Sequence, residues 1–245
     1  MLAASYGQGF AGENLVSYTR EQPLRNVNII VSLLSQLIPF ASGLYVLRSL
    51  SNEMKILLVY FGLALITESI NSYSALHNIK NLWLFHFFTI VEYGLLAWVF
   101  SSWQRSVMLR RVLRMSIPLF SLMGLISAIN KLGEFNASMR SVESLILVAA
   151  SAYTLFELSQ ASLSSLFKEP RFWVGSAALV YFAGSLVMFA LSNPVLRSGI
   201  EHARTVFAIY SILNAIASLI FAGGFICQFQ AQRSGGPSSL GPSPS

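Results

Sequence analysis

Four glutamates lie inside long apolar stretches of this 245-residue chain: Glu68, Glu92, Glu143 and Glu157. A charged side chain at the centre of a membrane helix costs on the order of 2.5–3.5 kcal/mol. Acidic side chains placed there commonly bind a proton, an ion or a ligand. Glu157 lies close to the end of its stretch, where a carboxylate can reach water, so we expect it to be interfacial.

Depth and helical spacing group several polar residues together. At 1.5 Å of rise per residue, Glu92 lies about 15 Å from Leu82, and Asn214 lies about as far from Arg204. Glu68 and Asn71 stand three residues apart and so share a helix face. Polar faces turned to lipid are costly, so we expect these side chains to face one another. The predicted ligand-binding residues are Glu68, Asn71, Glu92, Tyr210 and Asn214, with His86 and Glu143 as secondary candidates.

The chemistry of this set depends on what neutralises the glutamates. We expect no Lys or Arg at their depth, so each must be protonated, hydrogen-bonded or matched by a cationic ligand. The alternative is structural: interhelical hydrogen bonds of about 0.6–2 kcal/mol each that fix the helix register. No two of the three histidines stand four residues apart, and no nucleophile–base pair is evident. We therefore predict no metal, no cofactor and no enzymatic activity.

The composition indicates which elements position these residues. Hydrophobic residues are 54% of the chain and charged residues 11%, against about 25% charged in a globular domain. Such a chain is neither a soluble enzyme nor disordered nor fibrous. A bilayer core about 30 Å thick needs roughly 20 apolar residues per helix. The sequence predicts an all-α polytopic membrane protein with seven transmembrane helices, at about 27–48, 55–76, 82–103, 113–131, 138–160, 171–192 and 204–228.

Charge distribution predicts the domain plan and orientation. We expect residues 1–26 to be an extracytoplasmic segment, 27–230 the bundle, and 231–245 a disordered cytoplasmic tail. Seven Lys and Arg fall on the N-terminal side and nine on the other, where Arg105 to Arg114 form the densest cluster. Basic loops stay in the cytoplasm, which places the N-terminus outside. The net charge of +6 therefore reflects topology and does not indicate nucleic-acid binding.

The spans also contain an internal similarity. Five of the eleven positions are identical between Leu37–Leu47 and Leu145–Leu155, and Phe85–Glu92 parallels Phe207–Asn214. The pattern predicts two parallel triplets joined by a linker helix, a 3+1+3 pseudo-repeat. This alignment pairs Glu92 with Asn214.

Two resemblances follow from these patterns. The 3+1+3 plan, with polar residues at mid-depth in the third and seventh spans, resembles the SWEET sugar facilitators in architecture, although only Pro39 matches their helix prolines. Nearly the whole chain resembles an uncharacterised group of bacterial seven-helix inner-membrane proteins. The stretches that carry this likeness are NLWLFHFFTIVEY (81–93), RSVESLILV (140–148), FKEPRFW (167–173) and FAIYSILN (207–214). It implies a bacterial inner membrane and no particular chemistry.

Three functions fit the sequence. The first is a receptor or sensor whose outward-leaning cavity binds a small polar or cationic ligand and which signals through a separate cytoplasmic partner. The second is a small-solute or ion transporter using the same residues, with Glu92 or Glu68 binding a proton or cation. In the third, the polar residues only hold the helices together. The expected partners are the lipid bilayer, a small polar or cationic ligand and, for a sensor, a separate cytoplasmic signalling protein.

Overall fold

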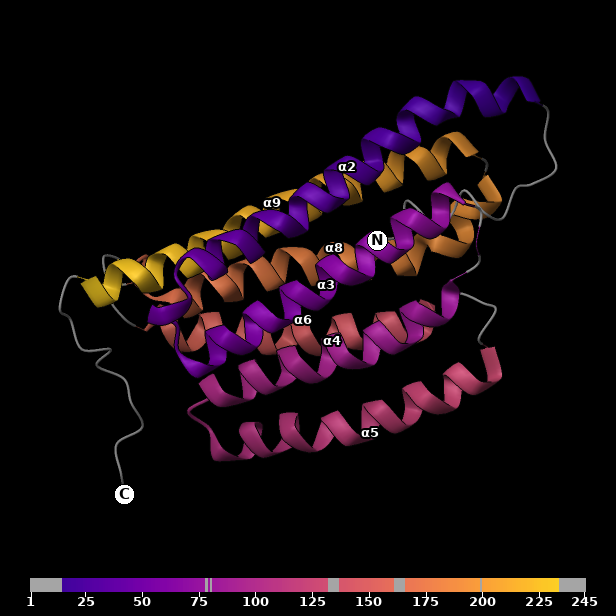
Figure 1. Ribbon diagram of the computed structural model, residues 1–245. Helices are drawn as coiled ribbons and strands as arrows, with labels where there is room; N and C mark the ends of the chain where they lie inside the picture. Colours follow the sequence, from indigo (N-terminus) through magenta and orange to yellow (C-terminus); the bar gives the residue numbers. More distant parts are fainter. Residues whose placement is uncertain are drawn as a thin grey trace.

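The computed structural model describes residues 15–77, 79, 81–131, 137–160, 166–198 and 200–233. These residues form seven α-helices and a short 3-10 turn, η2 (Leu47–Ser49), and they contain no strand (Figure 1). The helices are α2 (Leu15–Tyr45), α3 (Asn52–Leu76), α4 (Leu82–Trp103), α5 (Val107–Lys131), α6 (Ala137–Ser159), α8 (Pro170–Ser198) and α9 (Ile200–Arg233). The prediction of an all-helical chain is confirmed.

Most helices run beyond the apolar stretches that predict them. The α4 helix has the predicted bounds, whereas α5 begins at Val107 and so includes Arg110, Arg111 and Arg114 in its first two turns. The predicted helix end at Asn193 and Pro194 is wrong, because α8 continues to Ser198. A proline inside a membrane helix is tolerated where neighbouring groups satisfy the freed carbonyl.

Five described helices are long and apolar enough to cross a bilayer, which supports an integral, multi-pass membrane protein. Their apolar segments are Trp83–Trp103, Val107–Asn130, Ala137–Ser159, Pro170–Met188 and Ser211–Arg233. The α2 helix contributes a shorter apolar segment, Ile30–Tyr45. The polar residues of α3 that lower its hydropathy, Glu68, Asn71 and Ser72, are 1%, 3% and 5% exposed, so they face the protein interior and not the surrounding lipid.

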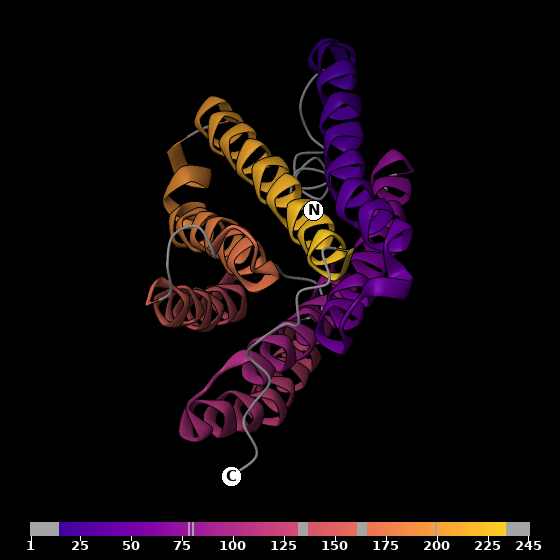
Figure 2. The ribbon, with the colours of Figure 1, turned by 90° about the vertical axis from the view of Figure 1, so that its left-hand side faces the viewer.

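Six of the helices pack as a ring (Figures 1 and 2). Within each half of the chain, consecutive helices pack together: α2 on α3 and α3 on α4, then α6 on α8 and α8 on α9. Two further contacts, α4 with α6 and α9 with α2, join the halves. The α5 helix packs on α4 at the edge, and 22% of its apolar segment is buried against 61% for α4. We call the α4–α6 and α9–α2 contacts the two seams.

Aromatic side chains fill the space between the helices. The Phe61 ring on α3 meets Phe221 and Phe225 of α9 edge-on, with ring centroids 5.0 and 6.2 Å apart. On its other side Phe61 meets Tyr60 at 4.9 Å, and Tyr60 stacks near Phe88 of α4 at 6.4 Å. Edge-to-face and offset pairs of this kind add to the stabilisation from burial. The aromatic core thereby ties α3 to both α4 and α9.

A glycine permits the close approach of α2 to α3 and α9. A Cβ at Gly43 would lie 2.7 Å from Leu58 Cδ1 and 3.2 Å from Phe225 Cε1. By contrast, a Cβ at Gly94 of α4 would meet only Ile117 Cγ2, at 3.8 Å. Both residues are helical, so replacing either by alanine improves helix propensity by a similar amount. The two sites differ in packing.

We expect Gly43→Ala to melt at a lower temperature than Gly94→Ala. Overpacking costs about 1–3 kcal/mol, and each kcal/mol corresponds to roughly 2–4 °C at this chain length. Thermal unfolding of the purified variants in detergent measures the difference. Equal melting temperatures would show that α2 does not contact α3 and α9 as closely as described.

Candidate functional site

Three helices bring four polar side chains together in the interior. They are Tyr60 of α3, Glu92 of α4, and Arg140 and Glu143 of α6, with exposed fractions of 4%, 0%, 7% and 0%. Glu92 lies near the middle of α4, and Arg140 and Glu143 stand one turn apart at the start of α6. Residues three apart on a helix share one face, so α6 presents both groups to α4. We call these four residues the Arg140 cluster.

Arg140 joins the two carboxyl groups of the cluster. Its Nη1 donates to Glu92 Oε2 across the α4–α6 seam and to Glu143 Oε2, 3.0 Å away on its own helix. The Tyr60 hydroxyl donates to the other Glu92 oxygen, Oε1, at 2.9 Å. Both oxygens of Glu92 therefore accept hydrogen bonds, one of them from a cation. Such charge-assisted bonds favour the ionised carboxylate.

The two glutamates are not equivalent. Glu143 Oε1 is buried, and none of the described residues forms a hydrogen bond with it. The cluster holds two carboxyl groups and one guanidinium, so it is electrically neutral when one proton is bound to a carboxyl group. Because Glu92 is satisfied as a carboxylate, that proton fits best on Glu143.

The expectation that no cation lies at the depth of the glutamates is wrong. Arg140 stands only one turn inside α6, which is why its sequence position suggests a loop residue. Its long side chain extends from that turn into the interior, where the guanidinium meets Glu92. The spacing of Arg140 and Glu143 in the sequence RSVE is the one signal that could have revealed the pair.

The other predicted site residues lie in separate contacts. Asn71 of α3 accepts a hydrogen bond at 2.5 Å from Asn81 Nδ2, at the start of α4. Asn214 of α9 donates to Ser35 Oγ of α2 at 3.1 Å, across the second seam. Glu68 is buried on α3, one turn before Asn71.

Two candidates remain outside this pattern. His86, a secondary candidate, is buried on α4 at 7% exposure. Tyr210 lies on α9, but its side chain is outside the described part of the structure. Three of the five primary candidates thus take part in separate contacts: Glu92 in the Arg140 cluster, Asn71 in the Asn71–Asn81 contact and Asn214 in the Asn214–Ser35 contact.

A further buried polar contact was not predicted from the sequence. Gln104, the residue that ends α4, is 1% exposed and donates from Nε2 to Thr154 Oγ1 of α6 at 2.9 Å. Its backbone carbonyl accepts from Arg110 Nη2 of α5, also at 2.9 Å. Gln104 thus joins the end of α4 to α5 and α6.

These contacts do not assemble a metal site. Among the described residues, no group of three or more His, Cys, Asp or Glu side chains could hold a metal ion. No known protein family, curated protein or solved structure matches this chain. The likeness to bacterial inner-membrane proteins stays a prediction.

We expect Arg140→Met to be strongly destabilising, because it leaves two carboxyl groups in the interior with no cation. Removing one partner of a buried ion pair typically costs about 3–5 kcal/mol. Denaturant or thermal unfolding in detergent measures the loss. A cost below about 1 kcal/mol, the level of an exposed pair, would contradict the buried geometry.

Glu143→Gln is expected to cost much less, below about 1.5 kcal/mol, the value of a typical hydrogen bond. The glutamine keeps an oxygen that can accept from Arg140, and the remaining Glu92–Arg140 pair is neutral without a bound proton. The same unfolding measurement, run beside Arg140→Met, checks the ranking. If Glu143→Gln were as harmful as Arg140→Met, Glu143 would be an ionised partner and not the proton-binding member.

Proposed function

We propose that this chain is a membrane transporter that couples the movement of a small solute to binding and release of a proton at the Arg140 cluster. One observation supports this most directly. Two carboxyl groups share one guanidinium in the interior, and Glu143 Oε1 has no hydrogen-bond partner among the described residues.

The energetics of that arrangement provide a coupling mechanism. With one proton bound the cluster is neutral and suited to an apolar interior. When the proton is released, one uncompensated negative charge remains, and an unpaired buried charge is very costly. Release is therefore favourable only when water or a cationic solute reaches the cluster. Proton binding would accordingly stabilise the closed arrangement of α4 and α6, and proton loss an open one.

The location of the cluster supports the same function. Glu92 and Arg140 meet at the α4–α6 seam, between the first three helices of the ring and the last three. Transporters built from internal repeats bind substrates and coupling ions at the repeat interface, near the middle of the bilayer. Glu92 is about 15 Å from the Leu82 end of α4, which corresponds to that depth.

The second seam supports the 3+1+3 pseudo-repeat. The register that sets Leu37 against Leu145 also sets Ser35 against Glu143, and the register that sets Phe85 against Phe207 sets Glu92 against Asn214. Ser35 and Asn214 are hydrogen-bonded across the α9–α2 seam, as Glu92 is bonded across the α4–α6 seam. We infer that α2–α3–α4 and α6–α8–α9 are two related triplets, with α5 as the linker on the outside.

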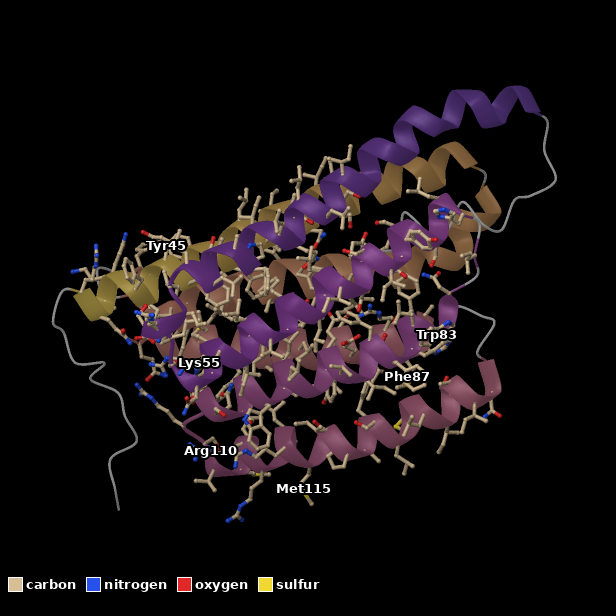
Figure 3. All side chains as sticks on the ribbon, in the orientation of Figure 1. Tyr45, Lys55, Trp83, Phe87, Arg110 and Met115 are labelled. Atoms are coloured by element: carbon tan, nitrogen blue, oxygen red, sulfur yellow. The ribbon has the colours of Figure 1, made fainter. Side chains whose placement is uncertain are left out.

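Charge distribution supports an orientation with the N-terminus outside. Arg140 is buried in an ion pair and is not a loop residue, so six of the seven basic residues on the N-terminal side remain to be compared with nine on the other. Lys55 and Arg110 lie at the bundle end opposite Trp83, in agreement with a basic cytoplasmic face (Figure 3). The orientation that the positive-inside rule gives is thereby strengthened.

A receptor for a small polar ligand is the second candidate, and one observation favours it. Asn71 Nδ2 and Ser72 Oγ are buried on α3 without a hydrogen-bond partner among the described residues. Buried polar groups are usually satisfied, so a ligand that accepts from Asn71 would complete this site. Two results together would favour the receptor over the transporter: a ligand that binds the protein but not Asn71→Ala, and no flux of that ligand across the vesicle membrane.

Proton movement tests the proposed function. We reconstitute the protein in vesicles that enclose a pH-sensitive dye and add small polar solutes, including sugars, amino acids and amines, one at a time. At least one solute is expected to drive a pH change in the lumen. Glu143→Gln and Glu92→Gln should each lower the initial rate at least tenfold, because neither variant needs a proton to be neutral.

Glu157→Gln is the matched control, since Glu157 lies on α6 outside the cluster and is partly exposed. It should retain the rate of the unmodified protein. A solute-driven pH change that continues at the unmodified rate in folded Glu143→Gln and Glu92→Gln would overturn proton coupling through this cluster.

A further inference from the structure

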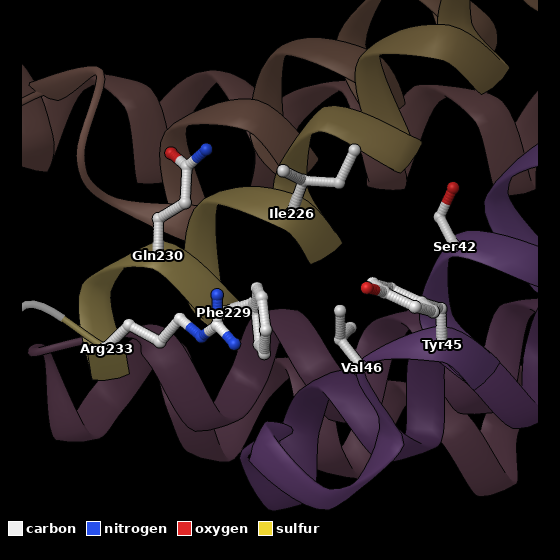
Figure 4. Close-up of a pocket in the computed structure, with 7 residues that line it drawn as sticks. All are labelled: Ser42, Tyr45, Val46, Ile226, Phe229, Gln230 and Arg233. Carbon is white, nitrogen blue, oxygen red and sulfur yellow. The ribbon is translucent and has the colours of Figure 1, made fainter.

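A groove separates the last turns of α2 and α9, at the opposite side of the ring from α5. It has a volume of about 760 Å³ and is lined by residues of both helices (Figure 4). Tyr45 of α2 is 83% exposed, and Ile226 of α9 is 45% exposed. On a protein that crosses a membrane, these side chains face lipid near one surface of the bilayer.

The groove contains an arginine held by aromatic rings. The Arg233 guanidinium lies over the Phe229 ring at 4.6 Å, and Phe229 in turn meets the Tyr45 ring edge-on at 6.2 Å. A guanidinium stacked on an aromatic face keeps its N–H donors free at its edges. Among the described residues, no carboxylate forms an ion pair with Arg233. Gln230 lies between Arg233 and Ile226 along the groove (Figure 4).

Polarity changes along the length of this groove. On the α9 side the lining changes from Ile226 to Gln230 and Arg233 toward the helix end, and on the α2 side Tyr45, the last residue of that helix, supplies a hydroxyl. The groove lies at the bundle end that also carries Lys55 and Arg110 (Figure 3). Polar donors beside an apolar surface match a phospholipid, whose charged headgroup meets the protein where its acyl chains begin. Basic pockets between membrane helices bind anionic headgroups in this way.

We propose that the α2–α9 groove binds an anionic phospholipid, with the phosphate on Arg233 and an acyl chain along Ile226. The guanidinium supplies paired N–H donors to two phosphate oxygens, a geometry that arginine favours over lysine. Tyr45 positions the headgroup at the membrane surface, as tyrosines do in interfacial belts. This site is independent of the Arg140 cluster, and its occupancy bears on the seam between α9 and α2.

Native mass spectrometry of the intact protein tests the proposal. The protein in detergent is titrated with phosphatidylglycerol and, separately, with phosphatidylcholine. We expect phosphatidylglycerol to bind more tightly, and Arg233→Gln to weaken it about fivefold, the factor for one basic residue at an anionic surface. Arg233→Lys, which keeps the charge but not the paired donors, should give an intermediate loss.

Arg111→Gln is the matched control. Arg111 is exposed on α5 at the same end of the bundle, so this variant has the same change in net charge away from the groove. It should bind phosphatidylglycerol as the unmodified protein does. Equal weakening in both glutamine variants, or none in Arg233→Gln, would overturn a specific site.

The source of the phosphate is decided by competition. Soluble glycerol phosphate, added in large excess, should not displace bound phosphatidylglycerol, because the acyl chain contributes to binding along Ile226. Displacement by glycerol phosphate would show that the acyl chain does not contribute and that the groove is a site for a phosphate ester, which would overturn the proposed lipid site.

Discussion

The interior of this bundle depends on one balance of charge: a guanidinium and two carboxyl groups enclosed by apolar side chains. None of the three groups is tolerable there alone, because a buried unpaired charge costs several kcal/mol. Arg140 donates to one oxygen of Glu92 and one of Glu143, and Tyr60 donates to the remaining oxygen of Glu92. The positions of α3, α4 and α6 relative to one another are fixed by this requirement, since a shift of any of them would separate a charge from its partner.

The same requirement connects the fold to the proposed function. The cluster lies at a seam between the two halves of the ring. A movement that separates the halves at this seam therefore also exposes the charges to water. The Phe61–Phe221–Phe225 core holds α3 to α9 and keeps the ring closed elsewhere. Groove and cluster lie at different seams, with Arg233 beside the α9–α2 contact and Arg140 at the α4–α6 contact. A bound lipid would therefore influence one seam and a bound proton the other.

Much of the fold could be predicted from the sequence because bilayer thickness requires long apolar helices. The Leu82–Trp103 helix has the predicted bounds, and the depth of Glu92 along it predicts an interior side chain, which is 0% exposed. The ion-pair partner of Glu92, Arg140, could not be predicted in this way. Arg140 stands near a helix start, and how far a flexible side chain extends is decided by packing between helices, which a linear pattern does not contain. The partner of Asn214 was not predicted for the same reason. Its depth matches that of Glu92, but it donates a hydrogen bond to Ser35 of α2, a helix distant in the sequence. Depth can be counted along one helix, whereas partners depend on which helices are neighbours.

We infer that the closed cluster holds one proton on a carboxyl group, and infrared spectroscopy of the purified protein observes that group directly. A protonated carboxyl has a carbonyl stretching band that a carboxylate lacks. Relative to the unmodified protein, we expect this band to lose the intensity of one carboxyl group in Glu143→Gln. We expect it to gain the intensity of one in Arg140→Met, where no cation remains to balance a carboxylate. A band that is unchanged in Glu143→Gln would show that the cluster holds no such proton and would contradict the account.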